Sequence, residues 1–248
     1  MVTLHEHEVD LTTPSGPMRT IVFAPTGNGR HPGIVLSSEI FQITAPVRRL
    51  AAFLAGHGFL VAVPEVFHDL EPRGCVLAYD QAGAERGNAH KLARPIGAFD
   101  ADARAALDHL RNLPSCTGRL GAMGVCLGGH LALRAALQPD VLAAACCYAT
   151  DVHKGSLGMG GCDTLARLSD VRGELLMIWG QKDPHVPEAG RRLIHERLTE
   201  AGVTFSWHEW NAAHAFLRDE HSSGRYDPAV ARLTWDLILD LFQRRLRQ

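Results

Sequence analysis

Apolar and polar positions follow two patterns that alternate along the chain. Continuous apolar runs, of the kind buried on both faces of a parallel sheet, alternate with stretches of helical spacing. The runs predict strands at 33–38, 59–65, 119–125, 141–149, 174–180 and 203–211, and the helical stretches lie at 47–58, 100–113, 128–138, 187–202 and 227–246. Ahead of them, residues 6–11 and 18–25 can pair as an antiparallel hairpin. A polar loop of about 30 residues is predicted before the helix at 100–113.

This alternation predicts the fold class. Consecutive parallel strands need a crossover connection, and right-handed crossovers place the connecting helices on both faces of the sheet. No linker rich in proline, glycine or serine divides the chain, and it contains no repeat or low-complexity segment. We therefore expect a single doubly wound, mostly parallel α/β domain over residues 1–248.

Composition narrows the classes of function. Hydrophobic residues make up 46% of the 248 residues and charged residues 21%, with a formal net charge of −2 at pH 7. The charges are mixed and form no basic block, which argues against nucleic acid or a membrane surface as partner. No apolar run approaches the ~20 residues that span a bilayer. The polar, acidic N-terminus is not typical of a secretory signal.

The six cysteines indicate a reducing compartment. They show neither a CxxC pair nor zinc-like spacing, and stand at positions 75, 116, 126, 146, 147 and 162. In a chain of this length they are typical of reduced thiols, so we expect a cytoplasmic protein. Cys146 and Cys147 lie inside an apolar run, where they pack as small hydrophobic residues.

One cysteine stands in a different setting, in the segment GVCLGG at 124–129. A predicted strand ends at Val125 and a helix begins near Leu127, so Cys126 is the centre of a G-x-nucleophile-x-G turn. Such a turn strains its central residue and packs the neighbouring residues too closely for side chains, which explains the glycines. It exposes the central side chain at a helix N-terminus, where an anion such as a thiolate is favoured. The alternative is a glycine-rich turn with an incidental cysteine.

The partners of a nucleophile follow in the expected order. In this fold the acid and then the histidine come later in the chain. Asp183 stands just after the strand at 174–180, and His214 just after the strand at 203–211. Both lie at the carboxyl edge of the sheet, where ligands bind in such folds. We therefore predict a triad of Cys126, His214 and Asp183, in which the carboxylate orients the imidazole as general base and acid.

Three other histidines invite a different interpretation. His185 lies two residues from Asp183 and is predicted to be a surface residue of the loop. His5 and His7 alternate along a strand and have the spacing to hold a metal, but an exposed edge strand accounts for them as well. We predict no metal site and no organic cofactor.

These segments resemble the dienelactone hydrolase family, the branch of the α/β-hydrolases that uses cysteine in place of serine. VCLGG matches the nucleophile turn at Cys126, while GQKDPHVP and AAHAFLR match the segments of Asp183 and His214. SSEIFQI resembles the segment that carries a glutamate in the family, which makes Glu39 its counterpart. The four segments occur in the family's order and the similarity covers most of the chain, so the resemblance implies an α/β-hydrolase fold.

The resemblance implies how the thiol is controlled. A Glu39 carboxylate beside the thiol would keep it protonated by like-charge repulsion, and substrate binding would let Glu39 take the proton. The backbone N–H groups of Leu127 and Ile40 would then hold the oxyanion. An anionic lactone of the dienelactone type would open through an acyl thioester to a dicarboxylate. The alternative for Glu39 is a structural ion pair with an arginine.

The resemblance also implies two arginines that bind a substrate carboxylate. Arg218 follows His214 by four residues, and the stretch ERGNAHKLA makes Arg86 the second. A surface salt bridge for Arg218 and a solvated loop position for Arg86 are the alternatives. Tyr148 falls near a tyrosine of the family and is expected to contact substrate.

Departures from the family pattern bear on the substrate. Val125 stands where an aromatic residue often precedes the cysteine, Gln42 replaces a glycine, and Cys147 replaces a second aromatic residue. Residues 151–170 form a longer segment than usual, which we expect to act as a flap. We expect a monomer or weak oligomer acting on a small lactone or ester in aromatic-compound breakdown. The alternatives are a thiol esterase for another ester or lactone, and a non-catalytic redox sensor that uses Cys126 as an oxidisable switch.

Overall fold

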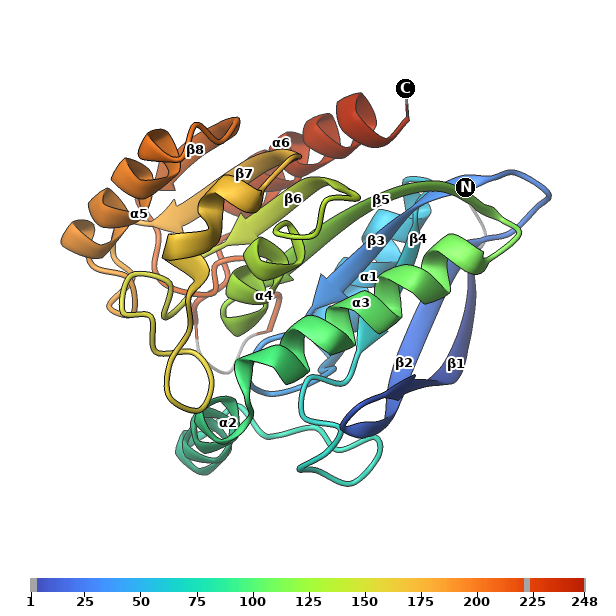
Figure 1. The fold of residues 1–248 in the computed structure, drawn as a ribbon, viewed down its shortest axis with the longest axis horizontal. Coiled ribbons are helices and arrows are strands. Elements are labelled where there is room, and N and C mark those ends of the chain that lie inside the picture. The colour runs from blue at the N-terminus through green and yellow to red at the C-terminus, as the bar shows by residue number, and fades with distance from the viewer. Residues whose placement is uncertain (1–3, 221–223, 248) are drawn as a thin grey trace.

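An eight-stranded mixed sheet runs through the computed structural model, which describes residues 4–220 and 224–247 (Figure 1). Its strands are β1 (Leu4–Thr13), β2 (Gly16–Pro25), β3 (His31–Ser37), β4 (Leu60–Pro64), β5 (Cys116–Val125), β6 (Val141–Cys147), β7 (Glu174–Gly180) and β8 (Phe205–Trp210). Its helices are α1 (Ala45–Gly56), α2 (Gln81–Ala93), α3 (Ile96–Asn112), α4 (Leu127–Ala135), α5 (Glu188–Glu200) and α6 (Pro228–Leu246), and η1 (Thr164–Asp170) is a 3-10 helix.

The strand order across the sheet is β1-β2-β4-β3-β5-β6-β7-β8. β1 pairs with β2, and β2 with β4, in antiparallel register, while all the later neighbours are parallel. The predicted hairpin is confirmed and is longer than expected, since Leu4 pairs with Pro25 at its open end. The predicted doubly wound, mostly parallel α/β architecture is confirmed as well.

Helices cover both faces of the sheet. In Figure 1, α3, α4 and α5 lie in front of the sheet, and α1 and α6 lie behind it. Successive strand residues alternate between these layers, so Ile34 and Leu36 pack toward α1 and α6 while Val35 packs toward α3 and α4. Because both faces are buried, the inner parallel strands β3, β4, β6 and β7 are apolar at nearly every position, whereas the edge strand β8 is only partly buried. Among the described residues, no helix is long and apolar enough to cross a membrane.

One helix corrects the sequence prediction. The stretch predicted as a polar loop contains α2, which begins after Asp80, whose carboxylate accepts a hydrogen bond from the Gly83 N–H at 2.7 Å. The helix has no apolar stripe, because the residues it buries are Gly83 and Gly87. These glycines bring its backbone against the carbonyls of Ala78 and Ile40. Hydrophobic periodicity cannot detect a helix that packs through its backbone, although Asp80 is a normal N-cap signal.

Candidate active site

The turn after β5 has the geometry predicted for a nucleophile. Cys126 has φ 58° and ψ −121°, a backbone conformation that side chains rarely adopt. Its N–H donates to the Cys147 carbonyl at 3.1 Å, which ties the turn to the end of β6. A Cβ on Gly124 would lie 1.8 Å from the Gly128 carbonyl oxygen, and one on Gly128 would lie 2.0 Å from that of Ser37. The predicted need for glycine at both positions is therefore met by backbone contacts.

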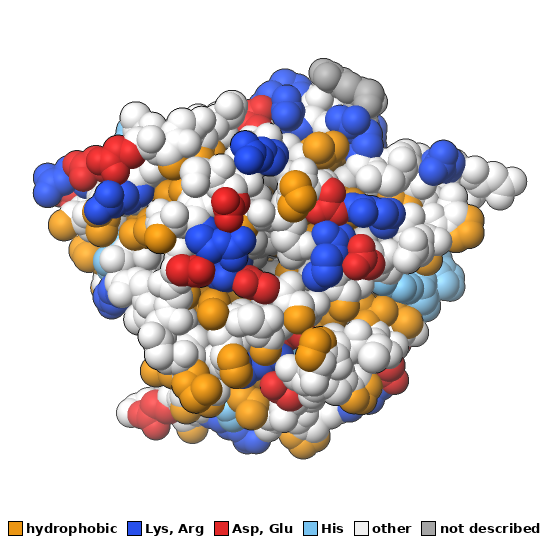
Figure 2. All heavy atoms as spheres, in the orientation of Figure 1, with side chains coloured by type: hydrophobic (Ala, Val, Ile, Leu, Met, Phe, Trp, Pro, Cys, Tyr) orange, Lys and Arg blue, Asp and Glu red, His pale blue; other side chains and the backbone are white. Residues whose placement is uncertain are grey.

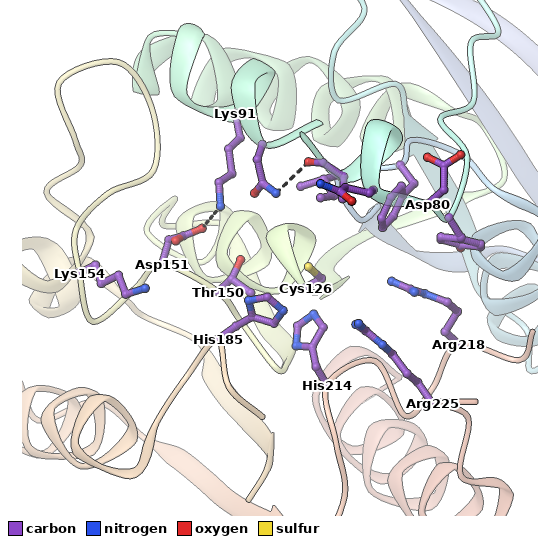
Figure 3. Close-up of a pocket in the computed structure, with 16 residues that line it drawn as sticks. Asp80, Lys91, Cys126, Thr150, Asp151, Lys154, His185, His214, Arg218 and Arg225 are labelled. Atoms are coloured by element: carbon purple, nitrogen blue, oxygen red, sulfur yellow. Dashed lines mark hydrogen bonds and ion pairs between the residues drawn. The ribbon is translucent and has the colours of Figure 1, made fainter. Parts of the chain in front are cut away.

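Asp183, His214 and Cys126 lie together at the carboxyl edge of the sheet. The His214 Nδ1 lies 2.6 Å from the Asp183 Oδ2, and the other Asp183 oxygen accepts the His185 N–H at 2.8 Å. The Cys126 side chain also acts on the charge state of His214. All three residues are buried, and Cys126 and His214 line a pocket of about 390 Å³ (Figure 3). The structure thus brings the three predicted triad residues together at this edge, with His214 bonded to Asp183 and sharing the pocket with Cys126.

The pKa values of His214 and Asp183 depend on the charges around them. Burial lowers the pKa of His214, but its interactions with Cys126 and Asp183 raise it to about 9. Burial raises the pKa of Asp183, but its hydrogen bond and charge interaction with His214 lower it overall. The site therefore favours a protonated imidazole next to the Asp183 carboxylate.

Glu39 and Arg218 form a buried ion pair beside the triad. The Arg218 Nε donates to both Glu39 carboxylate oxygens at 3.1 Å, and its Nη2 donates to Oε1 at 3.0 Å. The Arg218 guanidinium also lies 4.2 Å from the ring centroid of Tyr79. Ser37 pairs with Gly124, so Glu39 and Cys126 each lie two residues beyond paired positions on adjacent parallel strands. The ion pair considered as an alternative for Glu39 is present, and its partner is the predicted substrate arginine.

The predicted oxyanion-hole residues flank the same space. Leu127 is the first residue of α4, and the N–H groups of a helix's first turn have no acceptor inside the helix. Ile40 follows β3 and lines the pocket. An anion beside Cys126 would therefore meet the positive end of α4.

Two predicted substrate residues lie elsewhere. Arg86 does not line the pocket: its guanidinium pairs with Glu71, with Nε 2.5 Å from Oε1, and its side chain is 55% exposed. Tyr148 does not line the pocket either, because it is buried with its ring centroid 5.1 Å from that of His214. The structure therefore corrects both placements. Arg86 forms a salt bridge with Glu71, and the Tyr148 ring packs edge-on against the His214 imidazole outside the pocket.

The sequence interpretation missed several pocket residues. His185 is exposed as predicted, but it also lines the pocket, with its ring centroid 4.6 Å from that of His214. Further lining residues come from α2, from the segment after β6 and from the loop before α6: Asp80, Gln81, Ala84, Asn88, Lys91, Thr150, Asp151, Lys154 and Arg225. They carry no motif, so their position depends on tertiary packing.

The segment 151–170 forms one wall of the site. Asp151 and Lys154 line the pocket, and the N–H groups of Gly158 and Met159 donate to carbonyls of Lys91 and Arg94 at the end of α2. The segment is therefore docked on α2 in this structure. Its predicted movement as a flap stays a prediction.

A metal could in principle use part of the triad. Within the described ranges, Asp183, His185 and His214 form one group whose possible ligand atoms lie within 4.8 Å of one another. Two of these residues are already joined by the 2.6 Å hydrogen bond described above. His5 and His7 lie on the edge strand β1 with ring centroids 5.2 Å apart, outside this group.

Comparison with known proteins agrees with this geometry. The model of the dienelactone hydrolase family matches residues 18–246. A Saccharomyces cerevisiae protein named "Putative carboxymethylenebutenolidase" is 39% identical over 258 residues, covering 100% of this chain and 93% of that protein. The carboxymethylenebutenolidase of Pseudomonas putida is 31% identical over 212 residues, 84% of each chain.

A solved structure shows the same fold. The crystal structure described as "Putative Dienelactone Hydrolase" from Klebsiella pneumoniae superposes with a TM-score of 0.81 at 23% identity, covering 97% of this chain and 98% of that one. The family model and the sequence relatives establish more than the fold. The chain belongs to the dienelactone hydrolase family, and it is a lactone or ester hydrolase of the α/β-hydrolase fold.

Proposed function

We propose that the protein is a cysteine-dependent hydrolase that opens an anionic lactone of the dienelactone type through an acyl thioester. The observation that carries the proposal is the strained Cys126 residue at the start of α4, which lines one pocket with a histidine that Asp183 holds. A buried arginine, Arg218, lines the same pocket and can recognise the carboxylate of the substrate.

The first step in this proposal is activation by the substrate. In the structure the Arg218 N–H groups donate hydrogen bonds to the Glu39 carboxylate. A substrate carboxylate that binds Arg218 competes with Glu39 for the same N–H groups, which releases the Glu39 carboxylate to accept the Cys126 proton. Activation would therefore require a carboxylate on the substrate.

Acylation and hydrolysis then follow. The Cys126 sulfur attacks the lactone carbonyl carbon, and the N–H groups of Leu127 and Ile40 bind the developing oxyanion. The ring C–O bond breaks and an enolate oxygen leaves, giving an acyl thioester. His214, oriented by Asp183, takes a proton from water as the water attacks the thioester. The thiolate is released and takes back the proton held by Glu39, while the enolate takes the proton held by His214. The lactone has then gained one water to become an open-chain dicarboxylate.

The decisive experiment traps the acyl-enzyme. Mass spectrometry of the protein, quenched during turnover of a carboxylate-bearing lactone, should show a covalent adduct on the peptide that contains Cys126. The Cys126→Ala variant should lose the adduct and turnover together. Turnover that survives in Cys126→Ala would rule out this nucleophile.

A substrate panel separates this proposal from a thiol esterase for neutral esters. Arg218→Ala should lower kcat/KM for a carboxylate-bearing lactone at least tenfold more than for p-nitrophenyl acetate. An equal loss on both substrates would favour the thiol esterase. A role in the breakdown of aromatic compounds is part of the proposal, since the family substrate is an anionic lactone. So is a cytoplasmic location, which the six free cysteines support.

A redox sensor is the remaining alternative. It requires oxidation of Cys126 but neither His214 nor Asp183. If His214→Gln leaves lactone opening intact while peroxide oxidises Cys126 at an unchanged rate, the sensor interpretation gains and the hydrolase mechanism fails.

A further inference from the structure

The pocket has basic side chains at two ends (Figure 3). Arg218 and Arg225 approach from the loop before α6, whereas Lys91 comes from α2 and Lys154 from the segment after β6. In the close-up, Cys126 lies between these two groups. The mechanism proposed above uses Arg218 and leaves the other end without a role.

One end of the pocket carries a net positive charge. We call it the lysine end, and it is formed by Lys91, Thr150, Asp151 and Lys154. Lys91 Nζ lies 2.6 Å from Asp151 Oδ2, so these two charges neutralise each other. The other Asp151 oxygen accepts from the Ser156 hydroxyl at 3.2 Å. No acidic partner of Lys154 is present in the part of the chain that the structure describes. One positive charge is therefore left over at this end.

A buried hydroxyl at the lysine end has no partner. Thr150 is 6% exposed and lines the pocket, and its backbone is fixed because its N–H donates to the Cys126 carbonyl at 3.2 Å. Its carbonyl lies 2.9 Å from His130 Nδ1. Its Oγ1, however, makes no hydrogen bond within the described residues. An unsatisfied buried hydroxyl costs ~1–3 kcal/mol, which a ligand oxygen in the pocket would offset.

From these observations we propose that the lysine end binds a second anionic group of the substrate. The ammonium of Lys154 supplies the charge, the Thr150 hydroxyl supplies a hydrogen bond, and Lys91 keeps Asp151 from repelling the anion. The preferred substrate is then a dianionic lactone or ester, with one carboxylate on each side of the bond that Cys126 attacks. This inference rests on the proposed function, which places the first carboxylate at Arg218.

Binding of simple carboxylates tests the inference without a known substrate. Isothermal titration calorimetry would compare aliphatic α,ω-dicarboxylates of increasing length with monocarboxylates of equal length. We expect one dicarboxylate length to bind at least tenfold more tightly than its monocarboxylate. Lys154→Gln and Thr150→Val should abolish this preference, while monocarboxylate binding changes less than threefold. Arg192→Gln, which removes a charge from a 69% exposed side chain on α5, is the matched control and should retain it.

The outcomes separate the inference from the proposed function. If dicarboxylates show no preference, or if it survives in Lys154→Gln and Thr150→Val, the second subsite is wrong while monocarboxylate binding still supports Arg218. If monocarboxylates bind but Lys154→Gln weakens both ligand classes equally, Lys154 acts only as a general attractant and the inference is overturned. If no carboxylate binds and no carboxylate-bearing lactone is opened, both proposals fall.

Kinetics give a second readout. With a lactone that carries one carboxylate and an analogue that carries two, the wild type should show a higher kcat/KM for the analogue. Lys154→Gln should remove this advantage through KM and leave kcat unchanged, because Lys154 does not touch the reacting atoms. A loss confined to kcat would contradict a binding role.

Discussion

Single residues in strained conformations gather at the active site. Among the described residues, five non-glycine residues have positive φ: Gln42, Cys126, Tyr148, Asp151 and Ala215. Cys126 and Asp151 line the pocket, and Ala215 follows His214 directly. Each such residue costs ~1–3 kcal/mol, and the surrounding contacts must hold it in place. The chain thus concentrates local strain where it positions functional groups.

Gly128 should not tolerate a side chain at the turn. An alanine Cβ there would lie 2.0 Å from the Ser37 carbonyl oxygen, and this backbone cannot move without shifting β3. We expect Gly128→Ala to lower the free energy of unfolding by about 3 kcal/mol or more. Gly97→Ala is the control, since its Cβ meets nothing within 4 Å in α3, and it should stabilise by up to ~1 kcal/mol. Urea unfolding curves measure both, and equal stability of the two variants would contradict the steric argument.

The pKa of His214 should depend on Cys126. Burial lowers that pKa, and Cys126 is one of the main influences that raise it to about 9. In Cys126→Ala, the remaining interaction with Asp183 must act alone against burial, so the His214 pKa should fall. NMR titration of labelled histidines measures this directly. An unchanged pKa would show that the thiol is protonated across the titrated range.

The raised pKa of His214 also predicts how the free energy of unfolding depends on pH. Because the folded-state pKa of about 9 lies above the unfolded value of 6.5, the stabilisation linked to His214 is complete below about pH 6.5. It is lost as the pH rises through about 9. The wild-type free energy of unfolding should therefore decline over this range more steeply than that of Cys126→Ala.

At the scale of elements, α2 and the segment after β6 form walls of the pocket that carry no recognisable sequence motif. α2 packs through Gly83 and Gly87, and its apolar periodicity is accordingly absent. His130 on α4 joins the two ends of the segment, with Nδ1 2.9 Å from the Thr150 carbonyl and Nε2 2.8 Å from Thr164 Oγ1. The rigid core thus holds a loop that lines the pocket.

His130→Leu should loosen this segment selectively. The variant keeps the volume but leaves the buried Thr150 carbonyl without a donor, at a cost of ~1–3 kcal/mol. Burial also lowers the pKa of His130 to about 4, so the wild-type interaction should hold near neutral pH. Hydrogen–deuterium exchange should accelerate across residues 150–164 and stay unchanged in β5. Acceleration throughout the sheet would indicate global destabilisation instead.

At the scale of the whole molecule, the sequence predicts the sheet and the triad well, but the pocket poorly. Apolar runs and the turn around Cys126 are local signals, and Asp183 and His214 follow strands whose ends must meet at one edge. Arg86 is predicted at the site from sequence resemblance alone, which carries no information on the ion pair with Glu71 that holds its side chain outside the pocket. Lys154 and Arg225 were missed because only packing brings their loops to Cys126.

Charge is also distributed unevenly between surface and pocket. The chain has a formal net charge of −2, and Figure 2 shows basic and acidic side chains interspersed over the face that carries α3 and α4. The pocket is different, with four basic and two acidic side chains in its lining. Even with the buried Glu39 that pairs with Arg218, the site carries an excess of positive charge, and a cleft with such an excess concentrates ligands of the opposite charge.

This contrast predicts a salt dependence that follows the charge of the substrate. The local field, and not the net charge, should govern the encounter, so kcat/KM for an anionic lactone should fall several-fold between ~10 mM and ~300 mM salt. For p-nitrophenyl acetate it should stay constant, because a neutral ester gains nothing from the field. Arg225→Gln should flatten the salt dependence for the anionic substrate, and Arg192→Gln should leave it unchanged. A rise of kcat/KM with salt would mean that the net negative charge of the molecule outweighs the basic lining, and that the anionic lactone is not the substrate this pocket attracts.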